Sequence, residues 1–293
     1  MKSAVMEQSI VKARRAGSRR ISLKKVLIRG PLLILVVTQV YPLFWLLLYS
    51  LKTTDEIMKG SFIALPDSFR WENYAKAFVE GHYLQYLWNS IVVTCITVAV
   101  TLFLSTMVSY AVARFKSRMA KPVMLLFMIG IMIPIQSTLL PLMIIFRKIG
   151  ILDTHLSLIL PYVAFSIPIA VMIMSGFMRD IPYELEESAF MDGASILRMF
   201  FSIALPICMP PVMTVCILTF ISNWNEYIMA ATFLSSVDLR TLPFGTNSFM
   251  SQNSTDYGAL GAYLVMSVLP VILVYFFLSE KITSGMMAGA VKG

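Results

Sequence analysis

A short acidic stretch between two long apolar runs holds residues whose types and spacing suit one task. Glu187, Ser188 and Ala189 are followed by Asp192 and Gly193. Carboxylates favour the first turns of a helix, where they oppose the helix dipole. Asp-Gly is a turn signal, because glycine accepts the left-handed backbone that ends many helices. The stretch therefore predicts a helix and a turn with an acidic, small-residue tip that another surface can approach closely.

The chain after this tip predicts a second helix. Ser195 can cap its first turn, and apolar residues from Ile196 to Ile203 give it a buried face. It is expected to end near Leu205 and Pro206. Together the two helices would lie along one membrane surface.

The residue types that usually carry catalysis or metal binding are few and dispersed. His82 and His155 are the only histidines, and each lies at the end of a different apolar run. Cys95, Cys208 and Cys216 lie inside apolar runs without metal-ligand spacing, as small buried hydrophobic residues do. The chain also lacks the G-x-x-x-x-G-K-[ST] phosphate loop. We predict no catalytic residue, no metal site and no cofactor bound by this chain.

A polar cluster closes the fifth apolar run: Asn223, Trp224, Asn225 and Glu226. It lies about 30 Å beyond Pro206 along a helix, at ~1.5 Å per residue, and so near the opposite membrane surface. Two interpretations stay open. The cluster contacts the transported solute or a docked binding protein, or its aromatic ring lies in the interfacial belt with Glu226 already in water.

Other polar side chains in or beside the apolar runs have two possible uses, as solute contacts or as hydrogen bonds between helices. Helix packing is the more frequent use of any single one. These residues are Asn89, Gln136, Ser137 and Thr138.

These residues are positioned by a chain made mostly of apolar runs. Of its 293 residues, 58% are hydrophobic and 14% are charged, whereas soluble domains carry roughly 25% charged residues. Six runs without Asp, Glu, Lys or Arg each exceed the roughly 20 residues that cross a bilayer as a helix. We predict an all-α polytopic membrane protein with six transmembrane helices, in the runs 30–51, 81–113, 122–146, 154–178, 199–225 and 257–279.

Lysine and arginine predict the orientation of these spans. Seventeen of the 24 lie in the N-terminal segment, the second and fourth connections and the C-terminal tail. By the positive-inside rule, both termini and the acidic stretch face the cytoplasm. The net charge of +8 is then explained by anionic lipid, and we predict no nucleic-acid partner. The predicted organisation is a basic N-terminus (1–25), a first transmembrane helix (26–51), an external segment (52–84), a core of five spans (85–281) and a cytoplasmic tail (282–293).

Prolines occur inside each of the last four predicted spans. Proline removes a hydrogen-bond donor and kinks a helix, which membrane proteins tolerate where neighbours or a cavity satisfy the freed carbonyls. Either a moving pathway or ordinary helix irregularity accounts for them. They are Pro134, Pro141, Pro161, Pro168, Pro210, Pro211 and Pro270.

The segment 182–206 resembles the cytoplasmic loop of the membrane subunits of binding-protein-dependent ABC importers, E-A-A-x-x-x-G-x(9)-I-x-L-P. Every spacing agrees, and the one departure is Ser188 where the family usually has alanine. The segments 223–230 (NWNEYIMA) and 279–293 (SEKITSGMMAGAVKG) resemble the carbohydrate-uptake branch, and the maltose-permease-type subunit with six spans is the most similar type. The similarity covers roughly residues 33–293.

This resemblance implies a coupling helix, between spans four and five, that enters a cleft on an ATP-binding subunit. Two such subunits would hold ATP and Mg²⁺ and drive alternating access, and residues 289–293 would reach their interface. The other implied partners are a second permease subunit forming a heterodimer, an extracytoplasmic solute-binding protein and membrane lipid. The cargo would be a sugar or oligosaccharide crossing the bacterial cytoplasmic membrane. The implied ATPase-coupling residues are Glu187, Ser188, Ala189, Asp192, Gly193, Ile203, Leu205 and Pro206.

Two other classes of protein share some of these features. An autonomous secondary transporter or channel for a small polar solute would share the spans and prolines, but it would not need the 182–206 spacing, and no inverted repeat is visible. An intramembrane protease would need a histidine within the membrane or an H-E-x-x-H motif, and the sequence has neither. We therefore expect a transport subunit with no enzymatic activity of its own.

Overall fold

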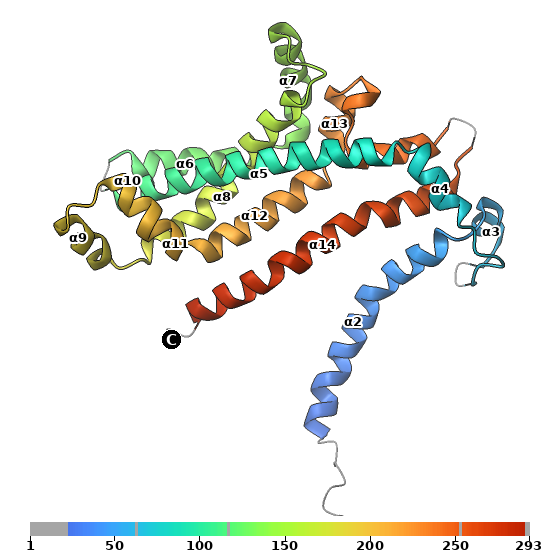
Figure 1. The fold of residues 1–293 in the computed structure, drawn as a ribbon, viewed down its shortest axis with the longest axis horizontal. Coiled ribbons are helices and arrows are strands. Elements are labelled where there is room, and N and C mark those ends of the chain that lie inside the picture. Colours follow the sequence, from blue (N-terminus) through green and yellow to red (C-terminus); the bar gives the residue numbers. More distant parts are fainter. Residues whose placement is uncertain (1–22, 62–63, 116–117, 252–253, 291–293) are drawn as a thin grey trace, which may run out of the picture. The chain divides into compact units, whose positions relative to one another are not determined.

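The computed structural model of the chain describes residues 23–61, 64–115, 118–251 and 254–290, with the backbone alone for 23–26, 28 and 278–290. The described residues are helical apart from loops and one isolated antiparallel bridge, Met250 with Thr255 (Figure 1). The predicted all-α class is confirmed. The chain divides into two compact units, residues 1–48 and 49–293, which are described separately.

The described part of the first unit is one helix, α2 (Leu23–Tyr49), whose last residue belongs to the second unit. Its portion Arg29–Tyr49 is long and apolar enough to cross a membrane. Most leucine and valine side chains along this portion are exposed, as expected for a helix whose solvent is lipid. Most of the predicted basic N-terminus, residues 1–22, lies outside the described residues.

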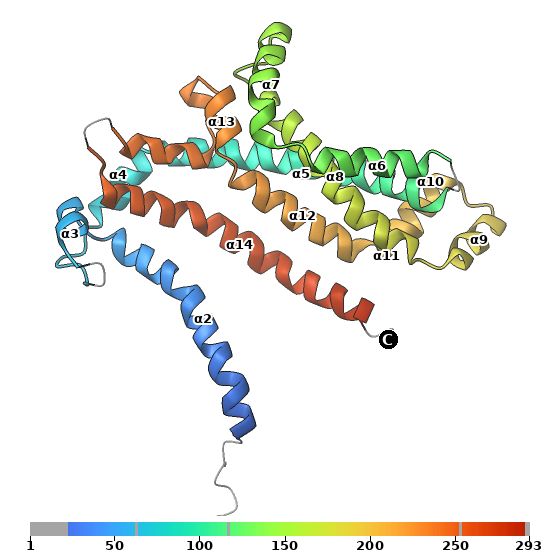
Figure 2. The ribbon, with the colours of Figure 1, turned by 180° about the vertical axis from the view of Figure 1, so that it is seen from behind.

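The second unit is built around three long helices, α5 (Tyr83–Arg114), α8 (Leu156–Arg179) and α14 (Tyr257–Ala290). Helices α5 and α8 pack side by side, and α12 (Met209–Trp224) packs against both of them and against α14 (Figures 1 and 2). Small hydroxyl side chains let the α5 backbone approach its neighbours closely. The buried ones are Ser90, Thr94, Thr97, Thr101, Ser105, Thr106 and Ser109.

Two of the six predicted spans are bent. Helices α6 (Ala120–Ile131) and α7 (Ile135–Ile149) meet at 97°, and residues Ile196–Ile207 meet α12 at 75°. Among the described residues, four straight helices and these two bent pairs could each cross a membrane. The predicted spans 122–146 and 199–225 are therefore each formed by two helices that meet at a bend.

The prolines differ in effect according to their position in a helix. Pro134 immediately precedes α7, and Pro210 and Pro211 open α12, where a missing N–H costs nothing. By contrast, Pro31 and Pro42 of α2 and four prolines of the second unit lie inside helices that continue through them. The four in the second unit are Pro141, Pro161, Pro168 and Pro270.

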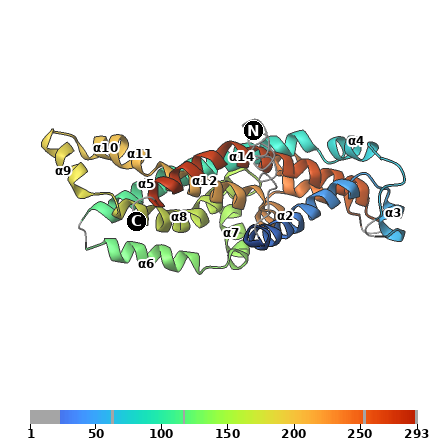
Figure 3. The same cartoon turned by 90° about the horizontal axis from the view of Figure 1, so that it is seen from below.

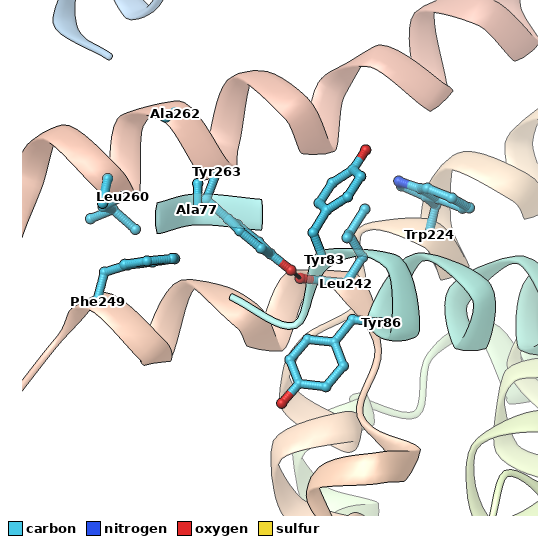
Figure 4. Packing of buried hydrophobic residues seen from close by; sticks show 10 residues of the cluster. Ala77, Tyr83, Tyr86, Trp224, Leu242, Phe249, Leu260, Ala262 and Tyr263 are labelled. Atoms are coloured by element: carbon cyan, nitrogen blue, oxygen red, sulfur yellow. Dashed lines mark hydrogen bonds between the residues drawn. The ribbon is translucent and has the colours of Figure 1, made fainter. Parts of the chain in front are cut away.

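One end of the second unit carries the short helices α3 (Thr54–Lys59), α4 (Glu72–Val79) and α13 (Ile228–Phe233), with 3-10 turns at Val237–Leu239 and Leu242–Phe249. An aromatic cluster holds this end together (Figure 4). In it, the Tyr263 hydroxyl donates to the Leu242 carbonyl at 2.8 Å, and the Tyr83 and Tyr263 rings meet edge to face. The cluster thus packs α14 against the loop that follows α13.

The opposite end of the second unit carries α9 (Tyr183–Met191) and α10 (Ile196–Met199), as Figure 3 shows. A π-helical turn, Phe200–Ala204, follows α10 and leads into α11 (Leu205–Ile207). The second helix of the acidic segment therefore runs past Pro206 and ends at the bend, slightly later than the sequence predicts. At the other terminus, α14 continues unbroken through residues 282–290, which the sequence assigns to the tail.

Candidate functional site

The acidic segment folds locally as its residue types suggest. Gly193 adopts φ +81°, the left-handed conformation expected after α9, and its N–H donates to the Phe190 carbonyl at 3.0 Å. The Ser195 hydroxyl caps α10 by accepting from the Arg198 N–H at 3.3 Å. The Ser188 hydroxyl bonds back to the Glu184 carbonyl, one turn earlier. Short-range chemistry thus shapes a compact helix–turn–helix tip.

This tip protrudes with most of its side chains unburied. Glu187, Ser188, Asp192 and Gly193 are exposed, and Ala189 is half-buried. Large apolar side chains accompany them, since Phe190 is 66% exposed and Met191 is 84% exposed. Sequence reasoning missed these two residues, although a Phe-Met pair beside a predicted turn was a visible signal. An acidic surface with apolar side chains at its centre is suited to binding another protein.

The segment 196–207, from α10 to α11, is the second arm of this site. The residues of the family motif that it carries lie closer to the membrane helices than the tip does. Ile203 and Leu205 are half-buried and Pro206 is exposed. On the same arm, Phe200 and Ala204 are buried in a core that also contains Tyr110 of α5 and Met174 of α8. The second arm is therefore packed onto the ends of two long helices, whereas the tip is free.

Arg114, the last residue of α5, connects this segment to the membrane helices. Its side chain is only 2% exposed, and Nε donates to Glu186 Oε1 of α9 at 2.9 Å. Nη1 donates to the carbonyls of Ile181 at 2.9 Å and Met178 at 3.3 Å, and the guanidinium lies 4.2 Å from the centre of the Tyr183 ring. A buried charge needs such a full set of partners, and this one ties α5, α8 and α9 together.

From the sequence, Arg114 is only one of the positive charges that predict the orientation of the spans. Its place at the end of a 33-residue charge-free run, 81–113, was visible. Its partners were not, because they lie about seventy positions away in sequence. The same contact brings together the second and fourth connections, which the charge pattern assigns to one side of the membrane.

A cavity of about 190 Å³ lies between α8 and α12. Its wall combines aliphatic side chains with a set of polar ones from both helices and from the break after α12. The polar lining residues are Tyr162, Ser166, Thr219, Ser222, Asn223 and Glu226. Of the polar cluster predicted from the sequence, Asn223 and Glu226 line this cavity and Trp224 and Asn225 do not. Asn223 lies 3.4 Å from Ser166, near the middle of the 24-residue α8, and is therefore deeper than the predicted position near the opposite membrane surface.

Glu226 holds the break between α12 and α13. Its Oε2 accepts from the Tyr162 hydroxyl at 2.6 Å, and its Oε1 accepts from the Met229 N–H at 2.7 Å. The carboxylate thus satisfies a donor at the start of α13 and links that helix to α8. Tyr162 was not a sequence candidate, because an aromatic residue in an apolar run gives no sign of a carboxylate partner.

The remaining sequence candidates have local partners. Trp224 is buried in the aromatic cluster, where it stacks on Phe220, and the exposed Asn225 donates to the Ile221 carbonyl of its own helix. Asn89 donates to the carbonyls of Asp238 and Arg240, which is a packing role. The hydroxyls of Ser137 and Thr138 bond three residues back, and Gln136 is exposed.

Asp153 links two loops at the end opposite α9. Its carboxylate accepts from the N–H groups of Ser235 and Ser236, at 2.8 and 2.9 Å, and from the Ser236 hydroxyl at 2.5 Å. These hydrogen bonds, the hydroxyl one first, lower the pKa of Asp153. Asp153 itself has φ +61°, a strained conformation held by these contacts.

The two histidines lie apart. His82 has a left-handed backbone at the start of α5, and His155 Nε2 lies 3.1 Å from the Leu239 carbonyl. In the part of the chain that the structure describes, no three His, Cys, Asp or Glu residues gather in a metal-binding group.

Comparison with known proteins agrees with this architecture. Residues 105–286 match the family described as "Binding-protein-dependent transport system inner membrane component". A putative ABC transporter permease protein of Caldicellulosiruptor sp. is 39% identical over 86% of this chain and 91% of its own length. A trehalose transport system permease protein of Mycobacterium tuberculosis is 33% identical over 86% of this chain and 92% of its own length.

A solved structure has a similar fold. It is a bacterial ABC transporter involved in the import of the acidic polysaccharide alginate, and it matches with a TM-score of 0.73 at 20% identity over 90% of this chain and 98% of its own. At that identity the likeness concerns the fold alone. The family match covers more than half of the chain. The chain therefore belongs to the family of binding-protein-dependent transport system inner membrane components and is a multi-pass ABC importer permease, a transport subunit rather than an enzyme.

Proposed function

We propose that this permease moves a sugar or oligosaccharide across the bacterial cytoplasmic membrane by alternating access. Two partner subunits bind ATP and Mg²⁺ and supply the energy, and a second permease subunit completes the pathway as a heterodimer. An extracytoplasmic solute-binding protein delivers the cargo. The protruding α9–α10 tip is the single observation that carries the proposal, because an isolated transporter has no use for it.

The tip is the proposed docking site for an ATP-binding subunit. Glu187, Ser188, Ala189, Asp192 and Gly193 present the surface, and the exposed Phe190 and Met191 supply apolar contact. The second arm, which includes Ile203, Leu205 and Pro206, supports the tip from the membrane helices. Residues 289–293 are a further proposed contact, and all but two of them lie outside the described residues.

Arg114 is the proposed mechanical link between this docking site and the pathway. Closure of the ATP-binding subunits would displace α9, and α9 is held to the end of α5 by a buried ion pair. Helix α5 packs along α8, which lines the cavity. A displacement of the tip is thereby carried to helices that contact the cargo, as shear between packed helices.

The sugar class is supported by the relative named for trehalose transport. The segment around Asn223 and Glu226 resembles the carbohydrate-uptake branch, and it forms part of a polar cavity between two spans. We assign Asn223 and Glu226 to the pathway wall. The exposed Asn225, beside the buried Trp224, is a proposed contact of the solute-binding protein.

The test is transport by the reconstituted complex. The chain is co-expressed with its neighbouring ATP-binding, permease and binding-protein genes, purified and placed in proteoliposomes. We expect tritiated trehalose or maltose to accumulate only with ATP and the binding protein. Accumulation by this chain alone, without ATP, would instead establish an autonomous transporter and overturn the proposal.

A further inference from the structure

We propose that the cavity between α8 and α12 is a subsite at which this subunit itself binds one ring of a neutral sugar. The proposal rests on the sugar-import function above and adds to it a place and a ligand chemistry. It also assigns direct cargo contact to this chain, which the resemblance to maltose-permease-type subunits does not require.

The depth of the cavity is the first argument. Ser166 lies ten residues after Leu156, about 15 Å along α8 at ~1.5 Å per residue, close to the middle of this 24-residue helix. Polar groups at such a depth are costly unless they face a cavity or one another, so they mark a pathway. Transporters place their substrate sites at this level, between helices that are interrupted. Helix α12 begins at a 75° bend and ends at a break before α13.

The free hydrogen-bonding capacity of the wall is the second argument. The Asn223 amide donates to the Thr219 carbonyl at 2.7 Å and lies 3.4 Å from the Ser166 hydroxyl, while its oxygen accepts from no described residue. Ser222 is exposed, and its hydroxyl has no partner among the described residues. The wall thus offers an amide oxygen and hydroxyls that can donate and accept, as sugar hydroxyls require.

Glu226 has a different part in the wall. Its carboxylate oxygens are used by Tyr162 and by the N–H groups of α13, so it has less capacity left for a ligand. It orients the Tyr162 ring at one side of the cavity. Phe165, which also lines the cavity and is half-buried, can provide an aromatic face on which the C–H side of a pyranose ring packs.

The charge of the wall selects among sugars. Among the described residues that line the cavity, Glu226 is the only ionisable side chain apart from the Tyr162 phenol. None of these lining residues is Lys, Arg or His. A uronate or a sugar phosphate would place its negative charge near a carboxylate without a compensating cation. The volume of about 190 Å³ is small for an oligosaccharide, so the cavity takes one unit of it. The structure therefore points to a neutral pyranose.

The experiment uses the whole complex in two assays, with tritiated trehalose and maltose as neutral probes and tritiated digalacturonate as the anionic one. Equilibrium binding is measured on the purified complex without the binding protein, which otherwise dominates selectivity. Import is measured in proteoliposomes with saturating binding protein. The variants are Asn223→Ala and Ser222→Ala. The control is Thr214→Ala on the same helix. The Thr214 hydroxyl donates to the Pro210 carbonyl and lies outside the cavity.

We expect each cavity variant to weaken binding of the imported neutral sugar about 3- to 10-fold, the effect of one lost hydrogen bond, and to slow its import. Thr214→Ala should stay within about twofold of wild type. Since Ser222 is exposed and lacks a described partner, its alanine variant tests the site even if Asn223→Ala fails to fold. Wild-type import with unchanged binding in both variants overturns the subsite, as does tighter binding of digalacturonate. A wild-type complex that imports no sugar overturns the proposed function itself.

Discussion

Arg114 Nε lies 2.9 Å from Glu186 Oε1, and the two side chains are 2% and 13% exposed. The ion pair joins the end of α5 to α9, and no other described ion pair is buried on both sides. Because the same guanidinium also binds the carbonyls of Met178, Ile181 and Pro182, the junction between α8 and α9 is wrapped around it. Movement of α9 relative to α5 would have to break or carry these bonds.

The first prediction concerns this link. Arg114→Ala leaves Glu186 and three carbonyls without their donor, and breaking a buried pair of this kind costs about 3–5 kcal/mol. We expect ATP hydrolysis to continue while sugar imported per ATP falls at least fivefold, because the tip no longer moves α5. The measurement is the ratio of import to ATPase rate in proteoliposomes.

Arg179→Ala is the matched control, since Arg179 ends α8 nearby but is exposed. It should keep the wild-type ratio. Arg114→Lys keeps the positive charge beside Glu186 but loses the several N–H donors of the guanidinium. Its ratio of import to ATPase rate should lie between those of Arg114→Ala and Arg179→Ala. An unchanged ratio in Arg114→Ala would show that the contact is structural only.

The second prediction concerns the turn at the proposed docking tip. Gly193 has φ +81°, and a Cβ added there would meet open space, so Gly193→Ala adds backbone strain of about 1 kcal/mol without a clash. We expect weaker assembly with the ATP-binding subunit, measured by co-purification and by binding-protein-stimulated ATPase. Gly193→Asn should be milder, because asparagine tolerates this conformation.

Gly150 offers a control for strain alone. It has φ +75° at the end of α7, also with open space around it. Gly150→Ala should lower thermal stability by a similar amount and leave assembly with the ATP-binding subunit intact. Equal loss of assembly in both variants would contradict a specific role for the Gly193 turn.

The third prediction concerns Glu226. Glu226→Ala removes the acceptor of the Tyr162 hydroxyl and of the Met229 N–H, and an unsatisfied buried donor costs about 1–3 kcal/mol. We expect a lower unfolding temperature and loss of import. Tyr162→Phe removes one donor only and should be less destabilising. A destabilisation by Tyr162→Phe as large as that by Glu226→Ala would contradict the capping role.

The fourth prediction is a pH dependence at the loops joined by Asp153. Because hydrogen bonds from Ser236 and Ser235 lower its pKa in the folded protein, its contribution is complete above the unfolded value of about 3.9 and is lost as the pH falls through the folded value. Hydrogen exchange, expressed as protection factors, should show the Ser235 and Ser236 amides protected at pH 6 and losing this protection only at a pH below the unfolded value. In Asp153→Asn the protection should be weaker and independent of pH over this range.

Several features of the protein could be predicted from local sequence. Gly193 adopts the left-handed turn and Ser195 caps α10, because these conformations depend on residues within one helical turn. The break before α7 was harder to predict. Pro134 immediately precedes a helix, whereas Pro168 lies inside one. Whether the helix is interrupted at a proline depends on what packs around that proline.

By itself, the sequence determined that this is an all-α multi-pass membrane protein and located its acidic helix–turn–helix tip, since apolar runs, turns and caps are encoded within short segments. Only the tertiary structure decided that Arg114 clasps α9, that Tyr162 meets Glu226 and that polar side chains of α8 and α12 share one cavity. The reason is physical. Each of these relationships joins side chains more than fifty positions apart, and their pairing depends on how the helices bend and pack against one another.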